Sequence, residues 1–479
     1  MSETKPPLLA DATRDLAAFS SAIRFEDLPA EVVERIKTSV LDSIGCCIYG
    51  VTLPWTRKVQ QLVEAERSAP VASIMGSGRK TSVAGAVLVN GTAGHAFELD
   101  DIHKESIVHP GSIAIPIGLA LAEQAGGCSG RDFITAMAAG YEIGARVGNA
   151  ATMSLFFRGF HPQGTSGVFV AAGTAARMLG LDAAQTQNAL GIVGSQAGGL
   201  MAAQEGAMVK RFHAGRAAQS GVYSAQLASD GFTGILDVLE APYGGYLSSY
   251  SDQPNAARLT DGLGTVWETA KVGYKPHASV TSIHSAMDAL RGIMDLHGLD
   301  AADIASVDVG VSHMTYVHCA WPYKSQGVTA AQMNLFYGLA VIAIDGVAFV
   351  DQYREDRLAE PRILDFIARI KAHEDPEIDT MGPPFRHAAR VSLRARDGRV
   401  LSAEILNRRG SPENPLSQAD VEFKFRNVAR GCVSDDMLDR IVDACACLDQ
   451  LDDVLPLAGW LAAPTRTASN PSSVTATPT

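Results

Sequence analysis

The sequence has few cysteines, and their spacing excludes two kinds of cross-linked architecture. There are seven cysteines in 479 residues, an odd number, and no Cys-x-x-Cys pair is present. A disulfide framework or a zinc ribbon would require paired cysteines at short intervals. We therefore expect reduced, mostly buried thiols, with the adjacent Cys46 and Cys47 in the core of an apolar helical stretch.

The sequence also lacks a block of basic residues and a long apolar run. Forty basic against 52 acidic residues give a formal net charge of −12, which disfavours binding to a phosphate backbone. The most apolar stretches, at 112–122 and 335–350, are short or interrupted by Asp345, and the first residues contain no apolar leader. We expect a cytoplasmic protein that binds neither nucleic acid nor a membrane.

Three signatures of nucleotide-binding and hydrolytic enzymes are missing. The sequence contains no P-loop, no Gly-x-Gly-x-x-Gly between a strand and a helix, and no Gly-x-Ser-x-Gly elbow. The segment Gly-Ser-Gly-Arg-Lys-Thr at 76–81 lacks the final Gly-Lys-Ser/Thr of a P-loop, so we interpret it as a turn. These absences argue against a nucleotide-dependent enzyme and against a hydrolase with a nucleophile elbow.

Composition and periodicity predict a mainly α fold with an α+β second domain. Hydrophobic residues make up 47% of the chain and charged residues 19%, which is typical of a well-packed globular enzyme. From about residue 8 to 270, apolar residues recur at helical intervals, as at Val32, Ile36 and Val40. Small residues at 138–140 and 170–173 would let helices approach one another closely. We predict that residues 1–270 form the first part of an all-helical domain.

The pattern changes near residue 271. Residues 307–312 alternate like a strand, and 389–395 and 400–405 predict a β-hairpin around an Asp-Gly turn. With helices expected over 332–350 and 362–371, residues 271–408 form a predicted α+β lid domain. Amphipathic helices over 417–462 are expected to pack back on the first domain, which then comprises 1–270 and 409–462. The Ser/Thr/Pro-rich segment 463–479 is predicted to be disordered.

The densest group of functional side chains lies between residues 95 and 109. It contains three histidines, four carboxylates and a lysine: His95, Glu98, Asp100, Asp101, His103, Lys104, Glu105 and His109. Such a group could bind a divalent metal, supply acid–base groups, or form a solvated loop. It has none of the spacings specific to zinc or calcium, so we expect no metal. Its apolar flanks place it near packed helices, and a helix that begins after His109 would favour a bound anion.

Three further segments carry cationic or titratable groups. The loop around His161 could hold carboxylate oxygens on its backbone amides, or it could form only a tight turn. Lys210 lies in a largely apolar stretch, where a lysine either extends its ammonium group to solvent or binds an anion. Lys275 and His284 stand at the expected domain boundary, where ligand sites are common, although His284 could equally be a core or capping residue.

Together these segments resemble the MmgE/PrpD family over nearly the whole chain. The similarity rests on Asn-Gly-Thr-Ala-Gly-His at 90–95, Glu-Leu-Asp-Asp at 98–101, His-Pro-Gly-Ser at 109–112, Phe-His-Pro at 160–162, Val-Lys-Arg at 209–211 and Lys-Pro at 275–276. The family includes 2-methylcitrate dehydratase, cis-aconitate decarboxylase and iminodisuccinate epimerase. The resemblance implies a helical domain made from both chain ends, an α+β lid, a homodimer, and no metal or organic cofactor.

The resemblance also implies roles for individual residues. Catalytic positions of the family match His109, His161, Lys210 and a lid tyrosine, Tyr316 or Tyr323. Substrate-binding positions are expected at Glu98, Asp101, Thr165, Arg211, Lys275, His277 and His284. In the lid, Ser279 competes with His277 for one of these positions, and Ile102 stands where a threonine is common. His103 is expected to be a loop residue.

The shared chemistry of the family explains these residue types. Decarboxylation, dehydration and epimerisation beside a carboxylate all add negative charge near that carboxylate, which requires cationic groups and a proton donor or acceptor. We hypothesise that Lys210 and Lys275 hold carboxylates of a small polycarboxylate while His109 and His161 transfer the proton. Because residues 314–321 resemble fungal-type cis-aconitate decarboxylases, a lyase that acts on cis-aconitate is preferred. A 2-methylcitrate dehydratase, an iminodisuccinate epimerase and a non-enzymatic ligand-binding protein stay as alternatives.

Overall fold

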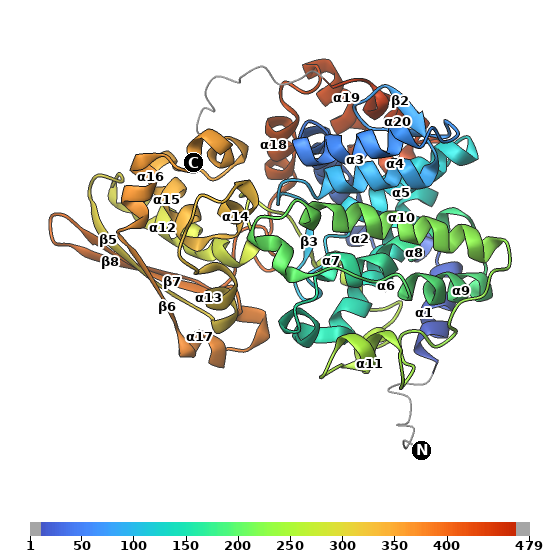
Figure 1. Ribbon diagram of the computed structural model, residues 1–479, viewed down its shortest axis with the longest axis horizontal. Coiled ribbons are helices and arrows are strands. Elements are labelled where there is room, and N and C mark those ends of the chain that lie inside the picture. The colour runs from blue at the N-terminus through green and yellow to red at the C-terminus, as the bar shows by residue number, and fades with distance from the viewer. Residues whose placement is uncertain (1–10, 466–479) are drawn as a thin grey trace.

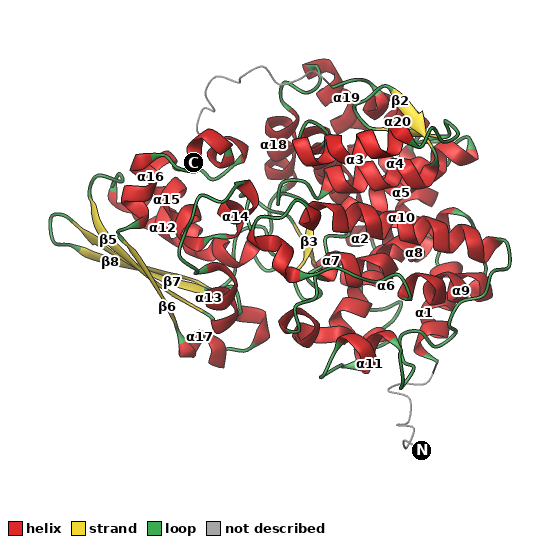
Figure 2. Ribbon diagram, viewed as in Figure 1, coloured by secondary structure: helices red, strands yellow, loops and turns green. Residues whose placement is uncertain are grey.

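The computed structural model describes residues 11–465, which fold into a helical domain and a smaller α+β domain (Figure 1 and Figure 2). Each domain has its own hydrophobic core. This architecture confirms the predicted mainly α fold with an α+β second domain. Of the tail predicted to be disordered, residues 466–479 lie outside the described residues, while the Thr465 amide donates a hydrogen bond to the Gly76 carbonyl at 2.9 Å.

The helical domain is built from both ends of the chain. In Figure 1 the red C-terminal helices lie against the blue and cyan N-terminal ones. The N-terminal part supplies α1 (Ala12–Ala22), α2 (Ala30–Gly50), α3 (Pro54–Ala65), α4 (Val83–Gly94), α5 (Gly111–Ala125), α6 (Gly130–Phe157), α7 (Pro162–Thr165), α8 (Gly167–Met178), α9 (Ala183–Gly194), α10 (Val209–Ser229) and α11 (Tyr246–Tyr250). The C-terminal part supplies α18 (Gln418–Ala429), α19 (Asp435–Ala446) and α20 (Leu455–Ala462). Within the described residues, no helix is apolar and long enough to cross a membrane alone; only α2 and α3 together, bent by 83°, satisfy that test.

Helical periodicity and small residues explain how these helices pack. The apolar positions of α2 that recur every four residues, such as Val32 and Ile36, are fully buried. A Cβ atom on Gly140 of α6 would overlap Thr174 of α8, and one on Gly215 of α10 would overlap the backbone of α4. Only glycine permits these close approaches. The contact of α4 with α10 brings the segment that follows α4 next to the beginning of α10.

The second domain is a four-stranded sheet covered by helices (Figure 2). Its strands are β5 (Ile304–Val311), β6 (Ile370–Glu374), β7 (Ala389–Ala395) and β8 (Val400–Ile405), in the order β6-β5-β7-β8. Strand β5 pairs in parallel with β6 and antiparallel with β7, and β7 and β8 form the predicted hairpin. The helices are α12 (His284–His297), α13 (His313–Cys319), α14 (Val328–Met333), α15 (Leu335–Asp345), α16 (Pro361–Ile367) and α17 (Pro376–Thr380).

Three local expectations about secondary structure are wrong. The helix expected over 332–350 is divided at Asn334, whose side chain accepts a hydrogen bond from the Tyr337 amide and thereby caps α15. The helix expected over 362–371 ends at Ile367, because the chain then pairs with β5 as strand β6. The helical domain also contains two short ladders, β1 (Ala72–Ile74) with β2 (Arg79–Thr81) and β3 (Ile102–His103) with β4 (Val272–Gly273). Strands of two or three residues are too short to produce an alternating pattern.

Candidate active site

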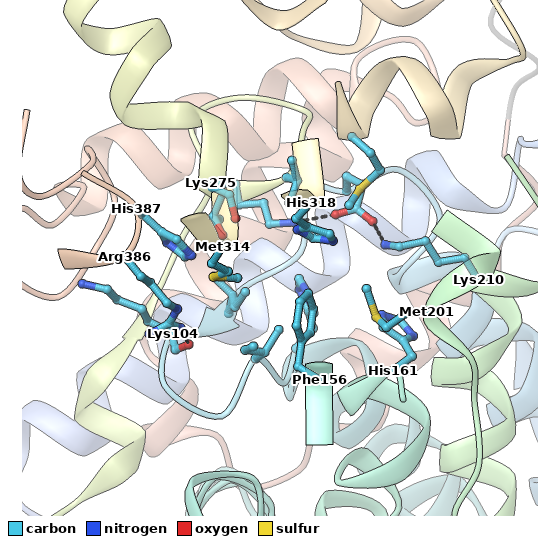
Figure 3. A pocket seen from close by; sticks show the side chains of 18 residues that line it. Lys104, Phe156, His161, Met201, Lys210, Lys275, Met314, His318, Arg386 and His387 are labelled. Atoms are coloured by element: carbon cyan, nitrogen blue, oxygen red, sulfur yellow. Dashed lines mark hydrogen bonds and ion pairs between the residues drawn. The ribbon is translucent and has the colours of Figure 1, made fainter. Parts of the chain in front are cut away.

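A cavity lies between the two domains (Figure 3). Each domain contributes about half of its lining. The helical domain supplies Glu98, Ile102, Lys104, Ile107, His109, Phe156, His161, Met201 and Lys210. The lid supplies Lys275, Val280, Thr281, Ser282, Met314, His318, Met333, Arg386 and His387. Four cations and one carboxylate therefore face the same space, which favours an anionic ligand.

The single lining carboxylate, Glu98, lies among three cations. Its Oε1 atom accepts hydrogen bonds from Lys210 Nζ and from Arg211 Nη1, the latter at 2.6 Å, while Oε2 lies 3.1 Å from Lys275 Nζ. Burial alone would raise the pKa of Glu98, but the charges of Lys210, Lys275 and Arg211 hold that pKa well below its ordinary value. Because one carboxylate cannot balance three cations, the cluster keeps positive charge for a substrate carboxylate.

Asp100 connects two of the buried histidines. Its Oδ2 atom is 2.7 Å from His95 Nδ1, and its Oδ1 atom is 3.4 Å from His109 Nδ1. Burial raises the pKa of Asp100, but the neighbouring His109 and His95 outweigh it and hold the pKa well below the ordinary value. The ionised carboxylate fixes the His109 ring so that its other nitrogen, Nε2, is the one left for the cavity.

The neighbouring Asp101 has a different environment. Its Oδ1 atom accepts a hydrogen bond from the Gly111 amide at 2.9 Å and so caps the beginning of α5, and its Oδ2 atom accepts one from Tyr141 Oη at 3.0 Å. Burial and the charges of Asp42 and Asp100 raise the pKa of Asp101 well above its ordinary value. Asp101 therefore holds a proton more readily than an ordinary aspartate, and it positions the beginning of α5, where His109 precedes the first turn.

His161 faces the same cavity from the turn before α7. Its Nδ1 atom is 2.8 Å from His213 Nδ1, which leaves Nε2 for the cavity. Burial, followed by the charge of Lys210, lowers the pKa of His161 well below its ordinary value, so the ring is neutral near pH 7. Gln163 joins the two histidine segments, because its side chain accepts from the His109 amide at 2.8 Å and donates to the His109 carbonyl at 3.0 Å. His109 and His161 are thus held on one wall.

Comparison with protein families identifies the chain. Residues 14–258 match the MmgE/PrpD N-terminal domain, and residues 277–450 match the MmgE/PrpD C-terminal domain. The chain belongs to the MmgE/PrpD family. This bears out the resemblance that was based on the motifs.

Curated relatives of this MmgE/PrpD chain align over almost its full length. It is 30% identical to a cis-aconitate decarboxylase of Aspergillus terreus over 474 residues, which cover 95% of this chain and 96% of the relative. It is 30% identical to the cis-aconitate decarboxylase-like protein oryM of Aspergillus oryzae over 467 residues, 93% of this chain and 96% of the relative. The human cis-aconitate decarboxylase is 26% identical over 471 residues, with 95% and 96% covered.

The MmgE/PrpD motifs bring only part of the predicted site to the cavity. Five predicted residues line it: Glu98, His109, His161, Lys210 and Lys275. Arg211 is fully buried behind them and contacts Glu98 and Gln332. Thr165 is buried and donates to the His161 carbonyl at 3.1 Å. With Asp101, they support the lining residues, so direct substrate contact by these three stays a prediction.

The predicted lid residues lie farther from the lining. His277 Nε2 pairs with Asp288 at 3.0 Å, and His284 Nε2 is 3.1 Å from the Ser279 hydroxyl. Tyr316 is partly buried and is not among the lining side chains, and Tyr323 donates to the Leu358 carbonyl at 2.9 Å. From the same helix as Tyr316, α13, it is Met314 and His318 that reach the cavity. The roles predicted for these lid residues therefore stay predictions without a contact in this structure.

Several lining residues were given no individual role by the sequence. Lys104, His318, Arg386 and His387 all face the cavity. No motif connects residues 386 and 387 with the 95–109 segment, because only the folded lid brings them together. His103, expected in a loop, is buried in β3, where its Nε2 atom lies 3.0 Å from Glu268 Oε2. This contact with a residue far along the chain explains why a histidine in a charged segment is buried.

Three MmgE/PrpD side chains could also hold a metal ion. One ligand atom each from His95, Asp100 and His109 lies within 4.8 Å of the others, and all three residues are buried. An ion there would compete with the 2.7 Å contact between His95 and Asp100. The cluster therefore fits a carboxylate that is hydrogen-bonded to His95 and lies 3.4 Å from the His109 ring at least as well as a metal site.

The lowered pKa of Glu98 predicts how the free energy of unfolding depends on pH. Its pKa is lower in the folded protein than the ordinary 4.5, so its ionisation stabilises the fold above that value and this contribution is lost as the pH falls through the folded pKa. Glu98→Gln leaves three buried cations without their carboxylate, and we expect a loss of about 3 kcal/mol at pH 7. Denaturant unfolding at pH 7 and at a series of pH values below 4.5 measures both effects. A difference between parent and variant that does not shrink on acidification would contradict this assignment.

Proposed function

We propose that this chain is a cofactor-independent lyase that decarboxylates cis-aconitate or a closely similar small polycarboxylate. The observation that carries the proposal is the inter-domain cavity, where Lys210 and Lys275 share one carboxylate and two imidazoles face the same space. The alignment over nearly the full length of cis-aconitate decarboxylases supports this reaction over the others of the family.

The cationic side chains and the proton-transfer groups of the site match what a decarboxylation requires. Loss of carbon dioxide breaks a carbon–carbon bond and leaves its electron pair on the substrate, conjugated with a second carboxylate, and a proton then takes the place of the lost group. Lys210 and Lys275 stabilise the added negative charge. His109 delivers the proton, because the Asp100 carboxylate stabilises its positively charged ring. The neutral His161 then takes up a proton from solvent and passes it to His109, which returns both rings to their starting state.

Parallel incubations test the reaction. The purified protein is supplied with cis-aconitate, 2-methylcitrate or iminodisuccinate in deuterated water, before and after dialysis against EDTA. We expect carbon dioxide and a product that carries one carbon-bound deuterium from cis-aconitate, with no change after dialysis. Loss of water from 2-methylcitrate, or exchange of deuterium into iminodisuccinate without net conversion, would instead indicate a dehydratase or an epimerase. Binding without turnover of any of the three would indicate a ligand-binding protein.

The lowered pKa of Lys210 predicts how kcat/KM falls at high pH. Burial lowers the pKa of the Lys210 ammonium to about 8, an effect that its contact with Glu98 only partly offsets. Because the charged form binds the carboxylate, kcat/KM is expected to fall as the pH rises through about 8. Lys210→Arg keeps its charge at all accessible pH values. This fall should therefore move to higher pH in the variant, and an unchanged fall would mean that another group controls it.

We also propose that the protein is a cytoplasmic homodimer. The seven free cysteines suit a reducing compartment. Exposed apolar side chains gather on the second half of α10 and the loop after it: Tyr223, Leu227, Phe232, Ile235, Leu236 and Tyr243. A patch of this kind is typical of an interface.

Light scattering after gel filtration should give the mass of a dimer. Leu236→Glu should shift the mass toward a monomer, whereas Leu296→Glu in the lid, at an even more exposed leucine, should not. A monomeric parent would refute the dimer.

A further inference from the structure

The cavity has a second group of basic side chains, two of them cations, that the proposed proton transfer does not use. In Figure 3, Lys104, Arg386 and His387 lie together on one side of the cavity, while Lys210 and His161 lie on the other. Met314 and Phe156 stand between the two groups. A ligand that reaches both groups must therefore carry anionic groups at two separated places.

The second group is a built site of buried polar atoms. Lys104, Arg386 and His387 are 7%, 8% and 5% exposed. Arg386 uses Nη2 on the Lys104 carbonyl and Nη1 on the Pro383 carbonyl, while its Nε atom and His387 Nδ1 are buried without a hydrogen-bond partner among the described residues. Unpaired buried polar atoms are uncommon in folded proteins, and a bound ligand is one way to satisfy them.

Charge in this part of the cavity is also unbalanced. Over the described residues 11–465, no carboxylate forms an ion pair with Arg386 or with the neighbouring buried Arg408. Two acids lie nearby: Glu413, which is 43% exposed at its side chain and 3.4 Å from Lys104 Nζ, and Glu105, which pairs with Arg258. Burial lowers the pKa of Arg386 to about 10, so it still carries its charge near neutral pH. Buried cations without a counter-ion are costly, and an anionic ligand removes that cost.

The position of Arg386 is fixed before any ligand binds. Its backbone carbonyl accepts hydrogen bonds from the hydroxyls of Ser312, at 2.6 Å, and Thr315, at 3.0 Å. Both hydroxyls belong to the beginning of α13, so the loop before β7 is held against the lid. The contact of Arg386 with the Lys104 carbonyl joins the lid to the helical domain. A guanidinium held in this way is pre-organised for a carboxylate.

We propose that Lys104, Arg386 and His387 form a second anion subsite, which binds the substrate carboxylate that is most distant from the reacting carbon. The inference rests on the proposed function only in taking the substrate to be a polycarboxylate. The subsite selects ligands with a carboxylate at this end, and it joins the two domains around the bound ligand.

Binding of two unreactive ligands tests the subsite. Tricarballylate is a saturated tricarboxylate, and methylsuccinate is the same molecule without one terminal carboxylate. We expect calorimetry to show that Arg386→Gln raises the Kd of tricarballylate roughly tenfold to a hundredfold, while the Kd of methylsuccinate changes little. Lys104→Met, from the other domain, should show the same selectivity, and Arg386→Lys should recover part of the affinity. Arg394→Gln, an exposed arginine on β7, is the matched control.

The outcomes separate the subsite from the reaction. If Arg386→Gln and Lys104→Met weaken both ligands equally, or weaken neither, the residues support the fold and the subsite is refuted. Thermal unfolding of each variant shows whether it is folded under the conditions of the titration. Loss of selectivity in a protein that does not decarboxylate cis-aconitate would keep the subsite and refute the proposed reaction. If the protein decarboxylates cis-aconitate but the variants weaken both ligands equally, the proposed reaction is kept and the subsite is refuted.

Discussion

Replacing His109 or His161 with alanine is expected to lower kcat by roughly 10²- to 10⁴-fold, the usual contribution of a positioned proton-transfer group. Both rings line the cavity; His161 Nδ1 is 2.8 Å from His213 Nδ1, and His109 Nδ1 faces Asp100 Oδ1 at 3.4 Å. Each therefore presents only Nε2 to a ligand. Initial rates of carbon dioxide release from saturating cis-aconitate measure the loss.

The exposed His297, at the end of α12, provides the control, and His297→Ala should leave kcat unchanged. KM should change less than kcat in the two active-site variants, because the cationic groups that hold carboxylates remain. Full turnover by both variants would show that neither histidine transfers the proton. Full turnover by one alone would assign the proton to the other.

Much of the fold could be predicted because long elements repeat their pattern. In α2, buried apolar residues recur at every fourth position, which predicts a helix. In the β7–β8 hairpin, apolar and polar residues alternate on both sides of an Asp-Gly turn, which predicts two paired strands. Strand β6 was missed because it is an edge strand of five residues whose side chains are mostly polar. Its place is decided by pairing with β5, some sixty positions earlier, and no local pattern encodes that contact.

The residues of the candidate site also differ in how well the sequence predicts them. Residues inside compact motifs, such as Glu98, His109 and Lys210, all line the one cavity. Arg386 and His387 follow a proline-rich loop that has no recognisable motif, and they reach the cavity only because the lid closes over it. Motifs therefore identified the wall supplied by the helical domain better than the wall supplied by the lid.

Asp100 and Asp101 are adjacent aspartates whose roles cannot be distinguished from the sequence alone. Their different surroundings in the structure predict different effects of the same substitution. Asp100 has a lowered pKa and faces two imidazoles, whereas Asp101 has a raised pKa and caps α5. Asp100→Asn removes the charge behind His109 and offers it an amide, which disfavours the required tautomer. We expect kcat to fall on the order of 10²- to 10⁴-fold, with substrate binding largely kept.

Asp101→Asn is the matched change one residue away, and we expect kcat to stay within about fivefold of the parent because an amide resembles a protonated carboxyl group. Its Oδ1 atom can still accept from the Gly111 amide, and its amide nitrogen can donate to the Tyr141 hydroxyl. Because folding raises the pKa of Asp101, keeping the proton costs stability as the pH rises above the ordinary value, and asparagine removes that cost. The variant should therefore be at least as stable as the parent at pH 7 in denaturant unfolding. An equal loss of kcat in both variants would mean that Asp101 is ionised and contacts the substrate, as the family resemblance implies.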